Sequence, residues 1–193
     1  MPPSSTRDLI AEKADALFYE VGFEATSFAD IAAQVGISRG NFYHHFKTKD
    51  EILDTVIIRR MRRTQTMLEG WQADGESPRD RILSFVHLVI ANQTKIMAFG
   101  CPVGTLCAEL AKLDHAAKGR AADIMGLFRG WLIGQFRALG AGDQAEGLAM
   151  HVLAWSQGVA VMAMAFHDEA FIHREVAGIT AWLDDLPRLS HHN

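Results

Sequence analysis

Apolar residues recur at helical spacing along the whole chain, which predicts helices throughout. The clearest pattern lies near the C-terminus, where an apolar side chain returns every three or four residues through two successive segments. These positions are Leu148, Val152, Trp155, Val159, Met162 and Phe166, then Ile172, Val176, Ile179, Leu183 and Leu186. The sequence shows no strict alternation of the kind that marks a half-buried strand. We therefore expect an all-α protein.

Further apolar stripes predict the other helices, and Gly or Pro residues mark the breaks between them. Helical periodicity covers residues 10–21, 52–61, 82–100, 102–113 and 124–139. The stretch 70–78 is rich in Gly, Asp and Ser and is expected to interrupt the chain, while Pro102 suits the first turn of a helix. Residues 1–6 are expected to form a disordered arm.

Two short helical patterns separated by a glycine lie between residues 28 and 45. The first begins after Thr26 or Ser27 as N-cap, and its apolar stripe is Phe28, Ile31, Ala32 and Val35. Gly36 ends it, because glycine tolerates the positive φ of a tight turn, and Ser38 caps a second helix over 39–45. Phe42 and Phe46 anchor that second helix inward. Such an arrangement is typical of a helix-turn-helix.

The outward side of the second short helix carries residues suited to nucleic acid, namely Arg39, Asn41, Tyr43 and His44. Arg can bond O6 and N7 of guanine and Asn can bond N6 and N7 of adenine, so Arg39 and Asn41 are the expected base readers. Tyr43, Lys47 and Lys49 are expected to contact the DNA backbone. The alternative for Tyr43 and His44 is that they only solvate a helix face.

This region resembles the TetR family of bacterial transcriptional regulators. The resemblance begins in the first amphipathic helix, closed by Gly22-Phe23, and is most specific in the run Phe42-Tyr43-His44-His45-Phe46 followed by Lys47-Thr48-Lys49-Asp50-Glu51-Ile52-Leu53. The family's DNA contacts, carried over position by position, fall on Thr26, Arg39, Asn41, Tyr43, His44 and Lys49. Arg39 and Asn41 depart from the residues often found at their positions, so no base preference can be transferred.

The resemblance also implies how the whole chain is organised. It implies a three-helix DNA-binding domain over residues 1–50 and a helical domain over 51–193 that binds an effector and forms a homodimer. We expect a cytoplasmic repressor that binds a palindromic double-stranded operator and leaves it when a small apolar inducer binds. The expected effector-binding residues are Phe99, Met125, Phe128, Trp131, Gln135, His151 and Trp155. Helical spacing alone favours a plain hydrophobic core for the apolar members of this set.

Small residues on the last two predicted helices point to a partner subunit. They occupy the faces that the apolar stripes leave uncovered, at Ala149, Ala154, Gly158, Ala160, Ala163, Ala170, Ala177 and Gly178. A helix that is apolar nearly all round must be buried on both sides. We expect that one chain cannot cover both Trp155, Val159 and Met162 on one face and Ala160, Ala163 and Gly178 on others. The sequence therefore predicts a homodimer through this pair.

Charge is distributed unevenly, although the formal net charge is only -4. Residues 39–65 contain seven Lys or Arg against three Asp or Glu, whereas the chain from residue 66 onward contains ten basic and fourteen acidic residues. This asymmetry favours a DNA-facing end joined to a body that DNA repels, and it disfavours a non-specific architectural DNA protein.

Cys101 supports an alternative mode of regulation. It lies between Gly100 and Pro102 at the expected start of a helix, where N–H groups and the helix dipole favour a thiolate. The Gly-Cys step resembles the sensing position of an electrophile-responsive subgroup of the family, which implies a thiol-based redox or electrophile sensor. The alternative is that Cys101 is a small buried apolar residue.

Other chemistries find little support. Residues 36–40 match the G-x-S-x-G pattern of hydrolases, but a helix rather than a strand precedes the serine. The histidines lack metal-binding spacing, so we expect no metal, no cofactor and no enzyme. The longest apolar stretch, residues 159–166, is too short to span a bilayer, so no membrane partner is expected.

Overall fold

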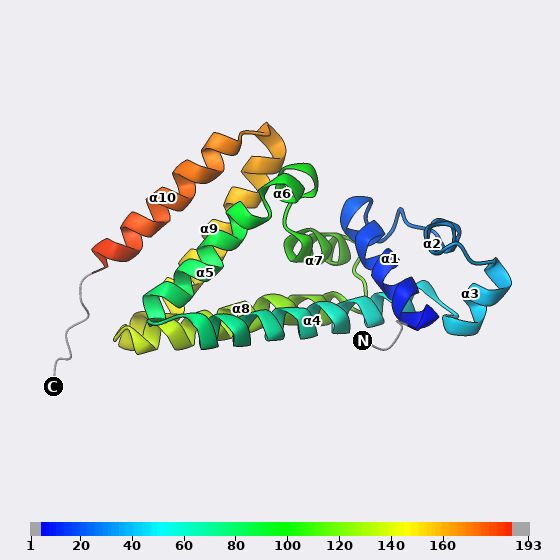
Figure 1. Ribbon diagram of the computed structural model, residues 1–193, viewed down its shortest axis with the longest axis horizontal. Helices are drawn as coiled ribbons and strands as arrows, with labels where there is room; N and C mark the ends of the chain where they lie inside the picture. Colours follow the sequence, from blue (N-terminus) through cyan, green and yellow to red (C-terminus); the bar gives the residue numbers. More distant parts are fainter. Residues whose placement is uncertain (1–4, 187–193) are drawn as a thin grey trace. The chain divides into compact units, whose positions relative to one another are not determined.

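The computed structural model describes residues 5–186, apart from the side chain of Arg39, and this part of the chain contains helices but no strand (Figure 1). The elements are α1 (Thr6–Glu20), α2 (Phe28–Val35), α3 (Arg39–His45), α4 (Lys49–Asp74), α5 (Pro78–Ala91), α6 (Gln93–Phe99), α7 (Pro102–Lys112), α8 (Lys118–Ala138), a 3-10 turn η1 (Gly142–Gln144), α9 (Ala145–Phe166) and α10 (Glu169–Asp185). The predicted all-α class is confirmed.

The helices pack as two compact units, and each unit is assembled from separate stretches of sequence. Unit 1 contains the described part of Met1–Arg63 together with Thr105–Ile124, and unit 2 contains Thr64–Gly104 together with the described part of Met125–Asn193. The helices α4, α7 and α8 therefore each contribute residues to both units. These units do not coincide with a simple division at residue 50, because side chains of α4 pair with acids of α1, Glu109 of α7 accepts from the loop after α1, and Arg120 of α8 pairs with Asp54 of α4.

Helix α1 begins at Thr6, one residue earlier than an N-terminal arm over residues 1–6 would allow. Ser5 is its N-cap: the Ser5 hydroxyl accepts from the Asp8 N–H at 3.1 Å, and the Ser5 N–H donates to the Asp8 carboxylate at 3.3 Å. This reciprocal capping satisfies two N–H groups at the helix end. Residues 5 and 6 are thus ordered as a helix start, and the rest of the predicted arm lies outside the described residues.

Helix α4 is longer than predicted and runs through the expected break at Gly70. A glycine inside a helix costs only about 1 kcal/mol relative to alanine, and neighbouring side chains offset that cost. Leu68 is 7 % exposed, and the Trp71 ring lies 5.6 Å from the Trp131 ring of α8. The break comes instead after Asp74, and Ser77 then caps α5.

The segment 82–100, predicted as one helix, is two. Helix α5 ends before Asn92, whose side-chain amide donates to the Leu88 carbonyl at 2.9 Å. Asn competes in this way with the backbone for helix carbonyls, which explains why it ends the helix. Helix α6 then ends at Gly100, and Pro102 begins α7 as predicted.

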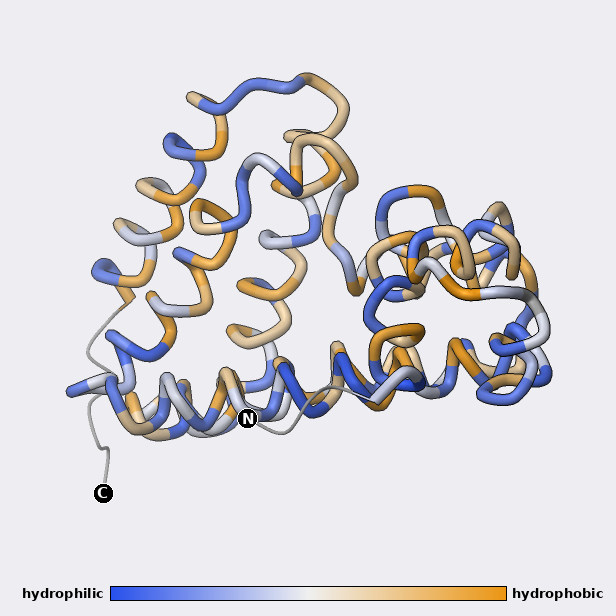
Figure 2. The backbone as a smooth tube through the Cα atoms, turned by 45° about the vertical axis from the view of Figure 1, so that its right-hand side comes forward, coloured by the Kyte–Doolittle hydropathy of each residue, from blue (hydrophilic) through white to orange (hydrophobic). Residues whose placement is uncertain are grey.

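Unit 2 has a hydrophobic core shared by α5, α8, α9 and α10. Figure 2 shows hydrophobic segments returning along α5, α9 and α10, in keeping with one apolar face per helix. The side chains of Ile82, Leu132, Phe136, Val152 and Ile172 are all fully buried in this core. In Figure 1, α10 runs beside α9 and α5, and it contacts both of them as well as α6.

Helix α9 and the preceding turn, Gly142–Phe166, are by length and composition apolar enough to cross a membrane, contrary to the estimate from residues 159–166 alone. The same test is passed by core helices of soluble proteins. In this structure Ala149, Val152 and Ala163 of α9 are fully buried in unit 2. This burial accounts for the apolar character of one side of α9.

Candidate nucleic-acid interface

Local hydrogen bonds explain why α2 and α3 form at all. Helices of eight and seven residues are marginal on their own in water. At the start of α2, the Ser27 N–H donates to the Asp30 carboxylate at 2.8 Å and the Asp30 N–H donates to the Ser27 hydroxyl at 3.2 Å. Gly36 ends α2 with φ +74°, and Ser38 caps α3 by accepting from the Asn41 N–H at 3.2 Å. The predicted turn and helix bounds are confirmed.

Two aromatic side chains and one arginine fix the orientation of α3. Phe42 and Phe46 are 1 % and 0 % exposed, as their spacing predicted. The Arg7 guanidinium donates to the His45 carbonyl at 2.6 Å and lies 4.1 Å above the Phe46 ring. A cation at a helix C-terminus meets the free carbonyls there, so Arg7 caps α3 from α1. Sequence reasoning missed this contact, which joins residues 38 positions apart.

The remaining side of α3 is exposed. Asn41 and His44 are exposed, and Tyr43 is 45 % exposed with its ring edge-on to Phe28 at 5.6 Å. Lys47 is also exposed, and its ammonium donates to the Tyr43 carbonyl. Arg39 is the first residue of α3, but its side chain lies outside the described structure. Three of the predicted DNA contacts, Asn41, Tyr43 and His44, therefore lie on the exposed side of one short helix.

The side chains of Thr26 and Lys49 bond to backbone carbonyls of their own unit. Thr26 is 2 % exposed, and its hydroxyl donates to the Gly22 carbonyl at 2.6 Å. The Lys49 ammonium donates to the carbonyls of Phe23, Glu24 and Thr26 at 3.0, 3.1 and 3.3 Å, and it lies 4.5 Å above the Phe23 ring. Both side chains therefore hold the loop between α1 and α2. The Thr26 hydroxyl is therefore engaged within the protein and is not among the side chains that we propose as DNA contacts.

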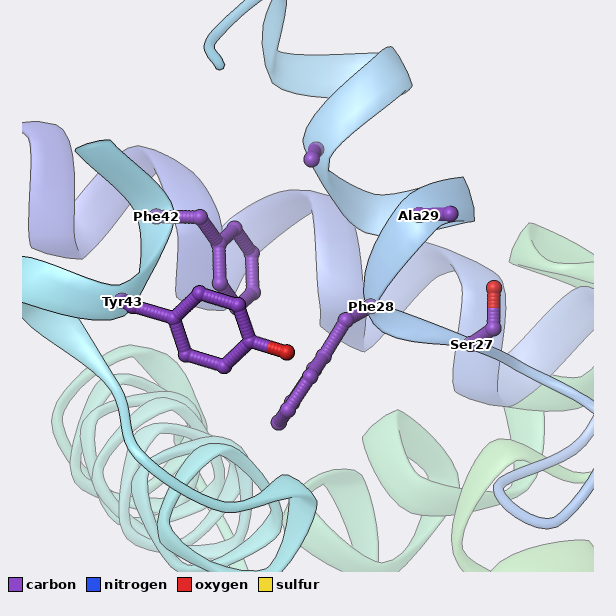
Figure 3. A pocket seen from close by; sticks show the side chains of 6 residues that line it. Ser27, Phe28, Ala29, Phe42 and Tyr43 are labelled. Carbon is purple, nitrogen blue, oxygen red and sulfur yellow. The ribbon is translucent and has the colours of Figure 1, made fainter. Parts of the chain in front are cut away.

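Two small cavities border this region. One, of about 240 Å³, lies between α2 and α3 and is lined by Ser27, Phe28, Ala29, Ala32, Phe42 and Tyr43. Figure 3 shows the rings of Phe28, Phe42 and Tyr43 around it, with the hydroxyls of Tyr43 and Ser27 as its polar groups. The other, of about 270 Å³, is lined by Glu24, Ala25, Thr26, Ser27, Phe28 and Lys49. Hydroxyl and ammonium groups of this kind suit contacts to phosphate and sugar.

The arginines at the centre of α4 are engaged with acids of α1. Arg59 pairs with Glu12 at 3.1 Å, while Arg60 and Arg63 both pair with Asp15, at 2.6 and 3.2 Å. Arg60 and Asp15 are nearly buried, with side chains 8 % and 12 % exposed. The two acids of α1 thus offset part of the local positive charge counted from the sequence, and these arginines fasten α1 to α4.

The predicted effector residues are divided between buried and exposed positions in unit 2. Phe128 and Gln135 are buried, whereas Phe99, Met125, Trp131 and Trp155 are half-buried. Gln135 donates to the Gln72 side chain at 2.8 Å, and the buried Trp131 Nε1 and Gln135 Oε1 have no hydrogen-bond partner within residues 5–186. His151 departs from the expectation: it is exposed and lies against the Trp182 ring, 4.6 Å away. These residues line neither of the two cavities above.

Cys101 precedes α7 directly, as predicted. Its sulfur accepts a hydrogen bond from the Gly104 N–H at 3.4 Å, in the position of a helix cap. Cys101 and Cys107 do not form a disulfide, and both are half-buried.

The last two helices are only partly covered by their own chain. Val159, Ala160 and Ala163 are buried in unit 2, whereas Met162 and Gly178 are exposed, so the chain covers by itself only part of the set that was expected to need a partner. Their neighbours on α9 are exposed instead: Met150 by 43 %, Val161 by 52 %, Met162 by 45 % and Phe166 by 73 %. On α10, Ala170, Ala177, Gly178 and Ala181 are exposed. Both helices thus keep an uncovered apolar or small-residue face.

Comparison with known proteins agrees with this geometry. Residues 10–56 match the family model described as bacterial regulatory proteins, tetR family. The chain is 30 % identical over 113 residues to an uncharacterized HTH-type transcriptional regulator of Lactococcus lactis, covering 58 % of each chain. It is 40 % identical over 55 residues to the HTH-type transcriptional repressor KstR2 of Mycolicibacterium smegmatis, covering 28 % of this chain and 27 % of KstR2.

The fold matches over a greater length than the sequence does. The matched stretches span well under two thirds of those two curated relatives. A TetR transcriptional regulator from Legionella pneumophila superposes with a TM-score of 0.83 and 22 % identity, covering 95 % of this chain and 98 % of that one. The N-terminal part of the chain, residues 10–56, therefore belongs to the tetR family of bacterial regulatory proteins, and the chain as a whole shares the fold of a solved TetR regulator.

Proposed function

We propose that this protein is a DNA-binding transcriptional regulator, acting as a repressor at a palindromic operator. The observation that carries the proposal is the exposed side of α3, where Asn41, Tyr43 and His44 face outward while Phe42 and Phe46 hold the helix from within. Recognition helices of this kind read base edges in the major groove through their N-terminal residues. Asn41, together with Arg39, is the proposed base reader, and Tyr43, Lys47 and Lys49 are the proposed backbone contacts.

The proposed active form is a cytoplasmic homodimer. The exposed apolar residues of α9 and the small residues of α10 support it, because soluble monomers rarely leave a large contiguous apolar patch in water. A twofold dimer would place two copies of α3 about one helical turn of DNA apart, which explains the expectation of a palindrome.

The experiment that tests this proposal is selection of bound DNA from a random pool, followed by titration of the selected sequence against random DNA. We expect enrichment of an inverted repeat and at least about a thousandfold preference for it over random DNA. Binding without sequence preference would replace the proposal with an architectural role.

The proposed signal is a small apolar effector bound in unit 2 among the half-buried Trp131, Trp155 and Met125 and the buried Phe128 and Gln135. Buried Trp131 Nε1 and Gln135 Oε1 supply a donor and an acceptor that could orient it. A thermal-shift screen with small apolar compounds tests this role. A compound that binds should raise the midpoint of thermal unfolding and release operator DNA, and both effects should be lost in Gln135→Leu.

Thiol sensing through Cys101 is the second candidate, favoured by the Gly104 N–H that donates to its sulfur. N-ethylmaleimide should then release operator DNA from the native protein but not from Cys101→Ser. Equal operator affinity before and after complete modification would leave Cys101 as a packing residue.

A further inference from the structure

Loop 22–26, between α1 and α2, is held by a carboxylate from a helix far away in the sequence. The N–H groups of Phe23 and Glu24 donate to the Glu109 carboxylate of α7 at 2.9 and 2.8 Å, one to each oxygen. Hydrogen bonds to an ionised acceptor are stronger than those between neutral groups. Glu109 therefore fixes two consecutive peptide groups of this loop.

The backbone at Gly22 is shaped to receive this carboxylate. Gly22 has φ +104°, which glycine adopts readily, and a Cβ at this position would lie 3.1 Å from Glu109 Oε1. The close approach of α7 thus requires a residue without a side chain at the start of the loop. Hydrogen bonding and shape identify the same partner independently.

Three carbonyls of the loop are bound by the start of α4. The Lys49 ammonium donates to the carbonyls of Phe23, Glu24 and Thr26. The buried Phe23 ring packs edge-on against His115, 5.2 Å away. Ser27, which caps α2, follows directly. The position of the loop, and through it the start of α2, is therefore set by α7 and α4 together.

We propose that Glu109 of α7 is a positioning residue for operator binding. The carboxylate holds loop 22–26 in the form that places α2 and α3 for DNA, and loss of the carboxylate releases the loop. This inference rests on the proposed DNA-binding function.

The direction in which operator affinity changes distinguishes loss of the clamp from simple removal of a negative charge. Removing an acidic group from a DNA-binding unit lessens repulsion of phosphate, so charge alone predicts unchanged or tighter binding. Loss of the clamp predicts weaker binding, because fewer molecules hold the binding-competent form. The two effects therefore have opposite directions.

The test compares Glu109→Gln with Asp123→Asn, which removes the same charge at nearly constant shape. Asp123 is exposed on α8 in unit 1, and it makes no hydrogen bond or ion pair within the described residues. Hydrogen exchange of loop 22–26 and the dissociation constant for the selected operator are measured on the full-length protein. We expect Glu109→Gln to speed exchange at residues 23 and 24 and to raise the dissociation constant about tenfold, with Asp123→Asn matching the wild type in both.

A second variant distinguishes loss of the clamp from a general loss of folding. Gly22→Ala introduces a strained φ and a Cβ close to Glu109, so it should also expose the loop and weaken operator binding while the exchange of α5 and α9 stays unchanged. Unchanged operator affinity in Glu109→Gln, with the wild type binding normally, overturns this inference alone. A wild type that selects no DNA overturns the proposed function and this inference with it, while loop exchange still reports whether the clamp exists.

Discussion

The contacts inside unit 1 differ in kind from the contacts inside unit 2. In unit 1, side chains from one helix bind the backbone of another: Arg7 caps α3, while Lys49 and Glu109 hold the loop before α2. In unit 2, long helices bury apolar faces against one another, with Leu132 and Phe136 fully buried. Hydrogen bonds are directional and hydrophobic burial is not. Unit 1 also has a buried apolar core, with Ile10, Phe42 and Leu53 at most 1 % exposed, so its directional hydrogen bonds add control of orientation to that burial.

Substitutions in the two units should consequently affect different measurements. A polar change in unit 1 should alter DNA binding with little loss of fold, because each hydrogen bond contributes only about 1 kcal/mol net. An apolar change in unit 2 should lower the free energy of unfolding. The following experiments test that contrast.

The largest effect is expected in the core of unit 2. Phe136→Ala should destabilise the protein by about 3–5 kcal/mol, because it removes a fully buried ring and leaves a cavity. Urea denaturation followed by circular dichroism measures this change. A loss below about 1 kcal/mol would show that the core can collapse around the gap and would weaken the contrast.

The next effect concerns the exposed face of α10. Gly178→Glu should dissociate the proposed dimer without unfolding the chain, since Gly178 is exposed and a Cβ there meets nothing within 4 Å. Operator affinity should fall about a hundredfold as the second half-site contact is lost. Sedimentation at micromolar concentration reports the oligomer, and Gly126→Glu on α8, equally exposed and open, is the matched control. A wild-type monomer would sink the dimer proposal.

A smaller effect is expected on the recognition helix of unit 1. Asn41→Ala should cost about 1–3 kcal/mol on the selected operator and relax preference at one base, while binding to random DNA stays the same. The free energy of unfolding should hardly change, because the Asn41 side chain is exposed. Equal losses on specific and random DNA would exclude direct readout by this side chain.

The helix cap of α2 should show a modest effect on stability. Ser27→Ala removes the hydroxyl that accepts from the Asp30 N–H, and it should lower the free energy of unfolding by about 1 kcal/mol. Ser27→Thr keeps the hydroxyl and serves as control. Equal stability of the two variants would contradict the capping argument.

The smallest effect is the pH dependence of the same cap. Hydrogen bonds from the Ser27 hydroxyl, and then from its backbone N–H, hold the pKa of Asp30 below its usual 3.8. A carboxyl with a lowered folded pKa adds stability above its unfolded pKa and loses it as the pH falls through the folded value. The stability difference between wild type and Asp30→Asn should therefore be constant near neutral pH and shrink below about pH 3.8. A difference that is the same at pH 7 and in strong acid would exclude the ionised cap.

Local patterns predicted the elements of unit 1 well. The apolar spacing, Gly36 and Ser38 gave the bounds of α3 and the inward direction of Phe42 and Phe46, because caps and helical periodicity act over a few residues. The same reasoning placed the break in α4 at Gly70, where packing of Leu68 and Trp71 outweighs the low helix propensity of one glycine.

Contacts distant in sequence escaped prediction. Nothing near Glu109 or Arg7 in the sequence marks their partners, which lie 86 and 38 positions away. The charge of Lys49 is visible in the sequence, which is why a DNA contact was predicted for it, but its three carbonyl partners in loop 22–26 are not visible there. Helical spacing also does not reveal which face of α9 the chain covers by itself: Val159 and Ala160 are buried in unit 2, whereas Met162 is exposed.

The discontinuity of unit 1 means that its helix-turn-helix is not a separable module. Leu106, Leu110, Ala121 and Ile124 are buried side chains of this unit, yet they come from a stretch more than forty residues beyond Arg63. A fragment ending at Arg63 would lack these side chains and the Glu109 clamp, and would expose apolar surface to water. Recombination with a relative would therefore have to exchange residues 105–124 together with the N-terminal segment to give a hybrid regulator that folds.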